Sequence, residues 1–117
     1  MKKVVVAFDC DGTLVTTDSA TTKQIVANER VRTMLIAFAS MKNTEIVVWS
    51  GSGEMWARQV VAALGLQKYV DRYSSKNLIG VDELGHPQFD PEIKPDVAVD
   101  DIQSCELGKI NLIVREK

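Results

Sequence analysis

The sequence predicts one α/β domain, a three-layer sandwich around a parallel sheet of about five strands, with no cap domain. Three observations lead to this fold class. The chain has 117 residues, enough for one hydrophobic core and too few for two, so residues 1–117 are treated as a single domain. Its short apolar runs are continuous rather than alternating, as in strands buried on both faces. Helical patterns separate these runs, and this alternation is typical of parallel sheets.

Five apolar runs are the candidate strands. The first, Lys2–Phe8, holds three consecutive valines and ends at an acidic turn. The second is Glu45–Trp49. The remaining three are the weaker run Tyr69–Tyr73, then Asp96–Val99 and Ile110–Val114. Each has the length of an ordinary strand.

Two segments between these runs have helical spacing of their apolar residues. In Asn28–Met41 the apolar side chains recur at intervals of three and four, and Glu54–Leu64 repeats the pattern. Gly65 follows the second segment as a left-handed helix stop, and Gln103–Leu107 is expected to form a short last helix. Strands joined by helices in this order predict right-handed crossovers and a Rossmann-like sheet.

The segment Asn77–Lys94 interrupts the alternation, because it contains glycines and prolines and no helical stripe. We expect a loop there, with at most one short hairpin. Thr16–Ala27 and Ser50–Tyr69 are the places where a cap could be inserted, and both are too short to hold one.

Composition excludes several classes of protein. Apolar residues make up 45% and charged residues 26%, with a net charge of −2, so we expect no extended basic footprint for nucleic acid. No apolar run approaches the roughly 18 residues of a membrane span, and we expect no membrane partner. Cys10 and Cys105 form no CxxC pair, which predicts reduced thiols in a cytoplasmic protein.

Chemically active side chains follow the predicted strands where each one ends. Asp9 and Asp11 follow the first strand, and Ser50-Gly51 follows the second. Lys76 comes after the third, and the pair at 100 and 101, both aspartates, ends the fourth. Ligands bind at the carboxyl ends of parallel strands, so these residues are expected to share one site. Crowded carboxylates need a cation, and hard oxygen ligands favour Mg²⁺.

A simpler interpretation exists for each group taken alone. Asp11-Gly12 is a common turn pair, Ser50 could be an ordinary residue of a helix N-terminal turn, and a loop lysine such as Lys76 is usually solvated. Two acidic pairs at two strand ends are harder to explain as turn residues, because clustered carboxylates repel one another.

These residues carry a resemblance to the haloacid dehalogenase (HAD) superfamily. Phe8-Asp9-Cys10-Asp11-Gly12-Thr13-Leu14-Val15 resembles the first signature of that superfamily, a buried strand followed by DxDGT[LV]. Val47-Val48-Trp49-Ser50-Gly51 resembles the second, and Val97-Ala98-Val99-Asp100-Asp101 is similar to the fourth. The likeness spans Val4 to Asp101. It is specific in the first signature and relies on order and spacing in the second.

The resemblance implies a role for each residue. Asp9 would be the nucleophile that forms an aspartyl-phosphate, and Asp11 the acid and base. An aspartate at position 11 implies phosphatase or phosphotransferase chemistry. Mg²⁺ would be held by the Asp9 carboxylate, the Asp11 carbonyl and Asp101, with Asp100 at the site or just behind it.

Phosphate binding is implied for the Ser50 hydroxyl, the Gly51 N–H and a lysine. Lys94-Pro95 superficially resembles the family's third signature, but Lys94 precedes the fourth strand. Six strand residues would put its backbone roughly 20 Å from Asp100. We therefore expect Lys76 to be the clamp.

An open site suits a phosphate on a large molecule, or a small substrate enclosed by another subunit of an oligomer. The Ser50-Gly51 turn and the segment Asp100-Asp101-Ile102-Gln103 also resemble the phosphatase domain of polynucleotide kinase and the deoxyribonucleotidases. This resemblance implies that the substrate is a nucleotide or a nucleic-acid end. Two alternatives stay open. One is a catalytically silent domain of the same fold, and the other is a receiver-like phospho-switch.

Overall fold

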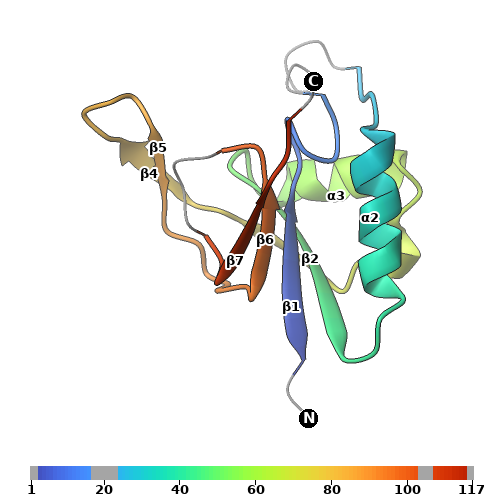
Figure 1. The fold of residues 1–117 in the computed structure, drawn as a ribbon. Helices are drawn as coiled ribbons and strands as arrows, with labels where there is room; N and C mark the ends of the chain where they lie inside the picture. Colours follow the sequence, from blue (N-terminus) through green and yellow to red (C-terminus); the bar gives the residue numbers. More distant parts are fainter. Residues whose placement is uncertain (1–2, 17–23, 103–106, 116–117) are drawn as a thin grey trace.

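Five strands form one parallel sheet in a computed structural model that describes residues 3–16, 24–102 and 107–115 (Figure 1). In chain order the strands are β1 (Val4–Asp9), β2 (Thr44–Ser50), β3 (Arg72–Ser75), β6 (Val97–Asp100) and β7 (Ile110–Ile113). Their spatial order is β3-β2-β1-β6-β7, and every neighbouring pair is parallel. The predicted α/β class and five-stranded parallel sheet are confirmed.

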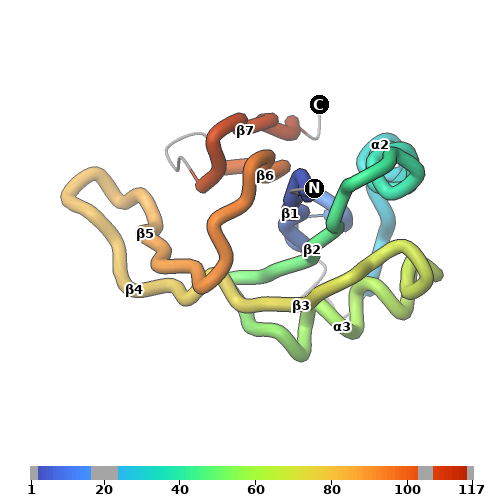
Figure 2. The backbone as a smooth tube through the Cα atoms, turned by 90° about the horizontal axis from the view of Figure 1, so that it is seen from below, coloured from blue at the N-terminus to red at the C-terminus, as the bar shows by residue number. Residues whose placement is uncertain are grey.

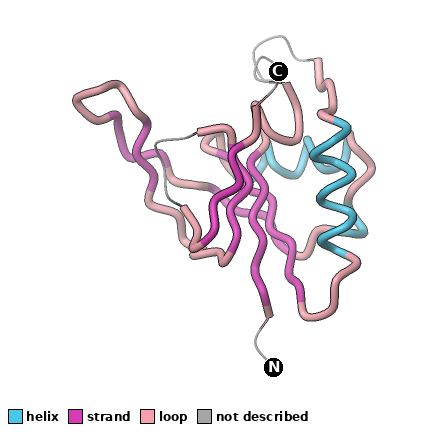
Figure 3. Tube along the Cα trace, in the orientation of Figure 1, coloured by secondary structure: helices cyan, strands magenta, loops and turns pink. Residues whose placement is uncertain are grey.

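Two α-helices pack against one face of this sheet (Figures 1 and 3). They are α2 (Glu29–Ala39) and α3 (Glu54–Ala63), and a 3₁₀ turn, η1 (Gln67–Tyr69), follows α3. Each lies inside the helical segment that the spacing of apolar residues predicts. Gly65 has φ of 68° after α3, a left-handed conformation that glycine adopts without a Cβ clash, so the predicted helix stop is confirmed.

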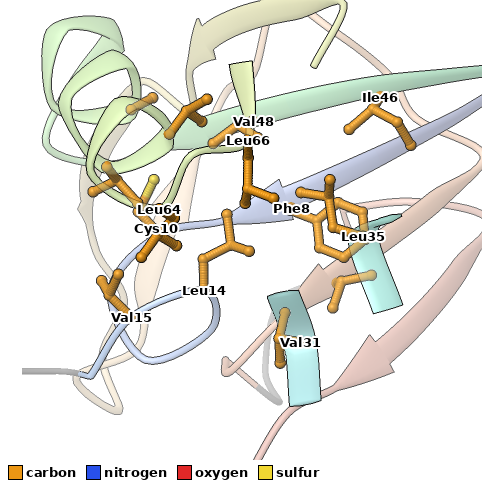
Figure 4. Close-up of a cluster of buried hydrophobic side chains, with 14 of the residues drawn as sticks. Phe8, Cys10, Leu14, Val15, Val31, Leu35, Ile46, Val48, Leu64 and Leu66 are labelled. Atoms are coloured by element: carbon orange, nitrogen blue, oxygen red, sulfur yellow. The ribbon is translucent and has the colours of Figure 1, made fainter. Parts of the chain in front are cut away.

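The core has two parts because strand side chains alternate between faces. Val6 and Phe8 of β1 belong to the helix-side cluster, together with Leu35 of α2 and with Leu64, which follows α3. Figure 4 shows the Phe8 ring beside Leu35. The Phe8 ring packs edge-on against Phe38 with centroids 6.1 Å apart. On the opposite face a smaller cluster contains Ala7, Val47, Trp49 and Ala98, with Ile93 and Leu107 packed against it.

The third strand begins later than predicted. The apolar run suggested Tyr69–Tyr73, but Tyr69 closes the 3₁₀ turn and β3 runs from Arg72 to Ser75. The Asp71 carboxylate explains the delay, because it accepts a hydrogen bond from the Ile46 N–H at 2.8 Å and fixes the register at which the chain joins β2. Tyr69 and Val70 instead pack on the helix-side core. The predicted start of this strand is therefore wrong, because these apolar residues belong to the turn that precedes β3.

The segment after β3 contains the anticipated hairpin. Strands β4 (Leu78–Val81) and β5 (Pro87–Phe89) pair antiparallel and form their own two-stranded sheet. It projects from the side of the main sheet opposite the helices (Figures 1 and 2). The apolar side chains of β4 and of the turn after it are exposed, among them Ile79 at 69% and Leu84 at 80%.

The described parts of the segments after β1 and β2 carry no inserted domain, which agrees with the expected lack of a cap. The predicted last helix, Gln103–Leu107, falls mostly on residues 103–106, which lie outside the described ranges. Within those ranges, no helix combines the length and the apolar character needed to cross a membrane.

Candidate active site

The sheet order places the ends of β1 and β6 together. Numbered by their order along the chain, the five strands follow the spatial order 3-2-1-4-5. The direction of winding reverses between β1 and β6, and ligands bind at such a switch point in open parallel sheets. Asp9 ends β1 and Asp100 ends β6, so two predicted carboxylates stand at the switch point. A receiver-type sheet has the order 2-1-3-4-5, so this topology disfavours the receiver alternative.

Asp9 is buried among charged and polar partners. Its side chain is only 6% exposed, and its Oδ1 lies 3.0 Å from the Lys76 ammonium. Its Oδ2 accepts a hydrogen bond from the Thr13 hydroxyl at 3.3 Å. The pKa of Asp9 is raised well above its ordinary 3.8, chiefly by burial and next by the Asp100 charge, although Lys76 lowers it. The surroundings of Asp9 thus favour its protonated form, and a bound cation would favour its ionised form.

The Lys76 side chain extends from the end of β3 past the end of β2 to the aspartates that end β1 and β6. Its ammonium is 3.0 Å from the Asp100 carboxylate as well as from Asp9, and its side chain is 2% exposed. Burial lowers its pKa, but the charges of Asp9 and Asp100 outweigh burial and raise it. Lys76 is therefore a buried ammonium shared by two carboxylates. Lys94, by contrast, is exposed and precedes β6, as the strand count predicted.

Asp101 sits directly over the backbone of Gly12. A Cβ placed on Gly12 would lie 2.2 Å from the Asp101 carboxylate, and Gly12 has φ of +82°. Only glycine satisfies both constraints, which explains the Asp-Gly pair in this turn. The pKa of Asp101 is raised to about 6 by partial burial and by the neighbouring Asp100.

Three carboxylates form a candidate metal site. Asp9, Asp100 and Asp101 each present one oxygen, and these oxygens lie within 4.8 Å of one another. With the single Lys76 ammonium among them, the fully ionised cluster has a formal charge of −2. All the donors are carboxylate oxygens, which suits a hard divalent cation such as Mg²⁺ and would offset the repulsion.

The Asp11 carboxylate is not part of that triad. Residues two apart on a strand point to the same side, which predicts that the Asp9 and Asp11 carboxylates lie together. Strand β1 ends at Asp9, so the alternation does not extend to position 11 and this prediction is wrong. A tight turn follows instead, with the Thr13 N–H donating to the Cys10 carbonyl at 3.1 Å and the Gly12 N–H to Val15 at 2.8 Å. The Asp11 side chain meets α3, where its Oδ2 accepts a hydrogen bond from Trp56 Nε1 at 3.0 Å.

Ser50 and Gly51 lie beside this cluster at the end of β2. The Ser50 hydroxyl oxygen accepts a hydrogen bond from the Ser52 N–H at 2.9 Å, and its carbonyl accepts from the Lys76 N–H at 3.0 Å. The first contact is that of a turn residue, and it leaves the hydroxyl proton able to donate. Ser50 is buried whereas Gly51 is exposed.

Three further residues contact the predicted site residues. Thr13 binds Asp9, Trp56 binds Asp11, and the Phe89 ring lies 4.4 Å from the Lys76 ammonium. Phe89 also borders Gly51, since a Cβ there would be 3.2 Å from its ring. Thr13 could have been found from its place in the DGT motif. Phe89 could not, because it comes from the hairpin and no local pattern connects it to Lys76.

Cys10 lies between Asp9 and Asp11 in the chain but belongs to the hydrophobic core. It is fully buried within the helix-side core (Figure 4). Burial, together with the nearby Asp9 and Asp11 charges, raises the pKa of its thiol. Cys10 is accordingly an inert core residue.

Comparison with known proteins does not assign the chain to a class: no protein-family model, no curated protein and no solved structure matches it. The interpretation of the site therefore depends on its own geometry and on the motif resemblance.

Proposed function

We propose that this protein is a phosphatase of the HAD type, which hydrolyses phosphomonoesters through an aspartyl-phosphate on Asp9 and depends on Mg²⁺. The observation that carries the proposal is the buried constellation at the sheet switch point, in which Lys76 bridges Asp9 and Asp100. A structural ion pair needs one carboxylate for one lysine. A cluster with an excess of carboxylates at a ligand-binding edge is instead suited to binding a cation and a phosphoryl group.

The first chemical step uses Asp9 and Asp11. A carboxylate oxygen of Asp9 attacks phosphorus while the phosphorus–oxygen bond to the alcohol breaks, and a proton on Asp11 passes to the departing oxygen. In the second step Asp11 takes a proton from water, and the water oxygen attacks the same phosphorus. The aspartyl–phosphorus bond then breaks, which releases phosphate and restores Asp9.

The remaining residues bind and orient. Lys76 offers a positive charge to the phosphoryl oxygens, while the Ser50 hydroxyl and the Gly51 N–H offer neutral donors. The oxygens of Asp9 and Asp101, with the Asp11 carbonyl, would hold Mg²⁺, and Asp100 would orient Lys76 from behind. When bound, the cation would neutralise charge on the phosphoryl group and so permit an anionic nucleophile to approach it.

The proposed substrate is a phosphomonoester on a nucleotide, a nucleic-acid end, another macromolecule or a small molecule. The first two choices come from the motif resemblance, and the lack of a cap domain in the described residues supports a phosphate carried by a large molecule. The net charge of −2 favours recognition of a single phosphate over an extended grip on a nucleic-acid backbone. A cytoplasmic setting, expected from the cysteine content, belongs to the same proposal.

The decisive experiment replaces the nucleophile. Asp9→Asn nearly preserves the shape of the side chain and removes its nucleophilic oxygen. We expect hydrolysis of p-nitrophenyl phosphate in Mg²⁺ to fall below a few per cent of wild type, with the circular dichroism spectrum unchanged. Asp90→Asn makes the same chemical change at an exposed aspartate and should retain full activity. Substantial turnover by Asp9→Asn would exclude covalent catalysis at Asp9, and an inactive wild type would support the silent-domain alternative.

A further inference from the structure

We propose that the β4–β5 hairpin docks a phosphorylated polypeptide, and that it selects a segment with basic and apolar residues near the phosphorylated side chain. Residues 77–92 are called the hairpin arm below. The statement that the docked polypeptide is phosphorylated rests on the proposed phosphatase function. The docking surface itself rests on the position, the exposure and the charge of the hairpin arm.

The base of the hairpin arm lies at the proposed phosphate clamp. Asn77 follows Lys76 directly and is joined to Asp90 by two hydrogen bonds of 3.0 Å. The Asp90 N–H donates to the Asn77 carbonyl, and the Asn77 side-chain amide donates to the Asp90 carbonyl. Next to this pair Leu78 is opposite Phe89, whose ring lies 4.4 Å from the Lys76 ammonium. A molecule that binds along the hairpin arm therefore lies beside a group proposed to hold phosphate.

The hairpin arm exposes large apolar side chains. Leu78, Ile79 and Val81 of β4 are 53%, 69% and 64% exposed, and Leu84 in the turn is 80% exposed. The arm projects from the side of the main sheet opposite the helices, and among the described residues its two strands pair only with each other (Figures 1 and 2). Burial of apolar side chains is favourable, and exposed apolar patches mark interaction surfaces. These four side chains thus form a surface suited to docking.

The charge of the hairpin arm restricts which molecule can cover this surface. Residues 77–92 contain four acidic residues, no lysine and no arginine, and all four acidic residues, Asp82, Glu83, Asp90 and Glu92, are exposed. These carboxylates repel the phosphates of a nucleic-acid backbone, and a second copy of the arm would bring like charges together. A polypeptide that carries lysine or arginine among apolar residues complements both the charge and the apolar surface.

The length of the hairpin arm predicts where the basic residues of the bound polypeptide lie. Glu83 is seven residues beyond Lys76 in the chain, so their backbones are at most about 23 Å apart at roughly 3.3 Å per residue. An extended polypeptide that runs along the arm covers this distance in about seven residues. We therefore expect its basic residues within about seven residues of the phosphorylated one.

A binding experiment tests the docking surface without turnover. Asp9→Asn protein is titrated into two fluorescein-labelled phosphothreonine peptides, and fluorescence anisotropy gives each Kd. One peptide has alternating lysine and leucine on both sides of the phosphothreonine, and the other has glutamate in place of every lysine. The basic peptide should bind at least about tenfold more tightly. This difference should disappear in about 1 M NaCl, where the screening length is about 3 Å. Equal Kd values at low salt would overturn the proposal.

Charge reversal distinguishes docking on the arm from general attraction to an acidic protein. In the Asp9→Asn background, Glu83→Lys should weaken binding of the basic peptide about fivefold, because an attractive contact becomes a repulsive one. Glu29→Lys is the matched control, because it changes the net charge equally at an exposed residue of α2, and it should weaken binding less than about twofold. Equal weakening by both variants would refute docking on the arm.

An apolar variant tests the other half of the surface. Ile79→Ser should weaken binding of the basic peptide about fivefold, since it removes apolar area from the interface. Met41→Ser removes an exposed apolar side chain after α2 and should have little effect. Light scattering addresses the other occupant. A wild-type dimer that Ile79→Ser converts to a monomer would assign the arm to a second copy of the chain and overturn the proposal.

Turnover by the enzyme with Asp9 intact separates the substrate classes. Glu83→Lys should raise KM for the basic phosphopeptide about fivefold, and it should leave kcat and the hydrolysis of p-nitrophenyl phosphate unchanged. An oligonucleotide with a terminal phosphate that is hydrolysed with a higher kcat/KM than the basic peptide would overturn the choice of a polypeptide. If the peptides bind as expected but wild type hydrolyses no phosphomonoester, the docking surface stands and the proposed phosphatase function fails.

Discussion

Removal of the Lys76 ammonium should destabilise the fold in a pH-dependent way. Lys76→Met keeps a long side chain in the buried position but removes the ammonium. The Asp9 and Asp100 carboxylates, each 3.0 Å from that ammonium, then lose their cationic partner. Breaking a buried ion pair typically costs about 3–5 kcal/mol. Protonation of one carboxyl would limit this cost, because a neutral acid no longer repels its neighbour.

That limit can be worked out. Holding a proton on a carboxyl of ordinary pKa 3.8 requires about 1.4 kcal/mol for each pH unit above that value. The limit is therefore about 4 kcal/mol at pH 7 and about 2 kcal/mol at pH 5. We expect Lys76→Met to lower the free energy of unfolding by about 3–4 kcal/mol at pH 7 and by about half as much at pH 5.

Urea unfolding followed by circular dichroism, in buffers that contain a chelator, measures both values. Lys94→Met is the control, because it removes an exposed lysine and should change stability by no more than about 0.5 kcal/mol. The reasoning would be refuted by a Lys76→Met cost below about 1 kcal/mol at pH 7. A cost that is the same at pH 5 and pH 7 would also refute it.

Three further predictions concern the carboxylate triad. Mg²⁺ should raise Tm, because it binds the folded state. Asp101→Ala should abolish most of this rise, and Asp100→Ala should abolish a smaller part of it. Scanning calorimetry with and without Mg²⁺ measures both effects. Because the pKa of Asp101 is raised from 3.8 to about 6, the folded state holds that proton more tightly, so the stability of the metal-free protein should fall as pH rises across this interval and level off above it. A urea series in chelator tests this, and stability that rises with pH would contradict it. Gly12→Ala should lower stability by about 1–3 kcal/mol because of its positive φ and should weaken the Mg²⁺ response by displacing Asp101, whereas an unchanged Tm would show that the turn can relax.

The sheet and its order of elements could be read from the sequence because each signal was local. Continuous apolar runs such as that of β1 mark buried strands, and Gly65 marks the end of α3 through its left-handed backbone. The start of β3 could not be read in this way. It depends on Asp71 and its hydrogen bond to Ile46, a contact between residues 25 apart that leaves no trace in a hydropathy pattern.

The candidate site divides along the same line. Its carboxylates could be placed because parallel strands bring their carboxyl ends to one edge, and Lys76 because it follows a strand while Lys94 precedes one. The side chains that contact these carboxylates and Lys76 come from other elements. Trp56 comes from the first turn of a helix and Phe89 from a hairpin, and nothing local in their segments connects them with acid chemistry.

The projecting hairpin has a consequence for how this protein behaves in concentrated solution. β4 is a short strand with exposed Leu78, Ile79 and Val81, and an exposed apolar strand edge is a template for pairing between molecules. Asp82 and Glu83 follow it directly and are exposed as well, so two negative charges stand at the end of the strand. Charged residues that flank an exposed apolar strand oppose aggregation, because two copies of the strand then repel each other. We therefore expect the colloidal stability of the folded protein to depend on these two carboxylates, because their repulsion opposes pairing of β4 with a second copy.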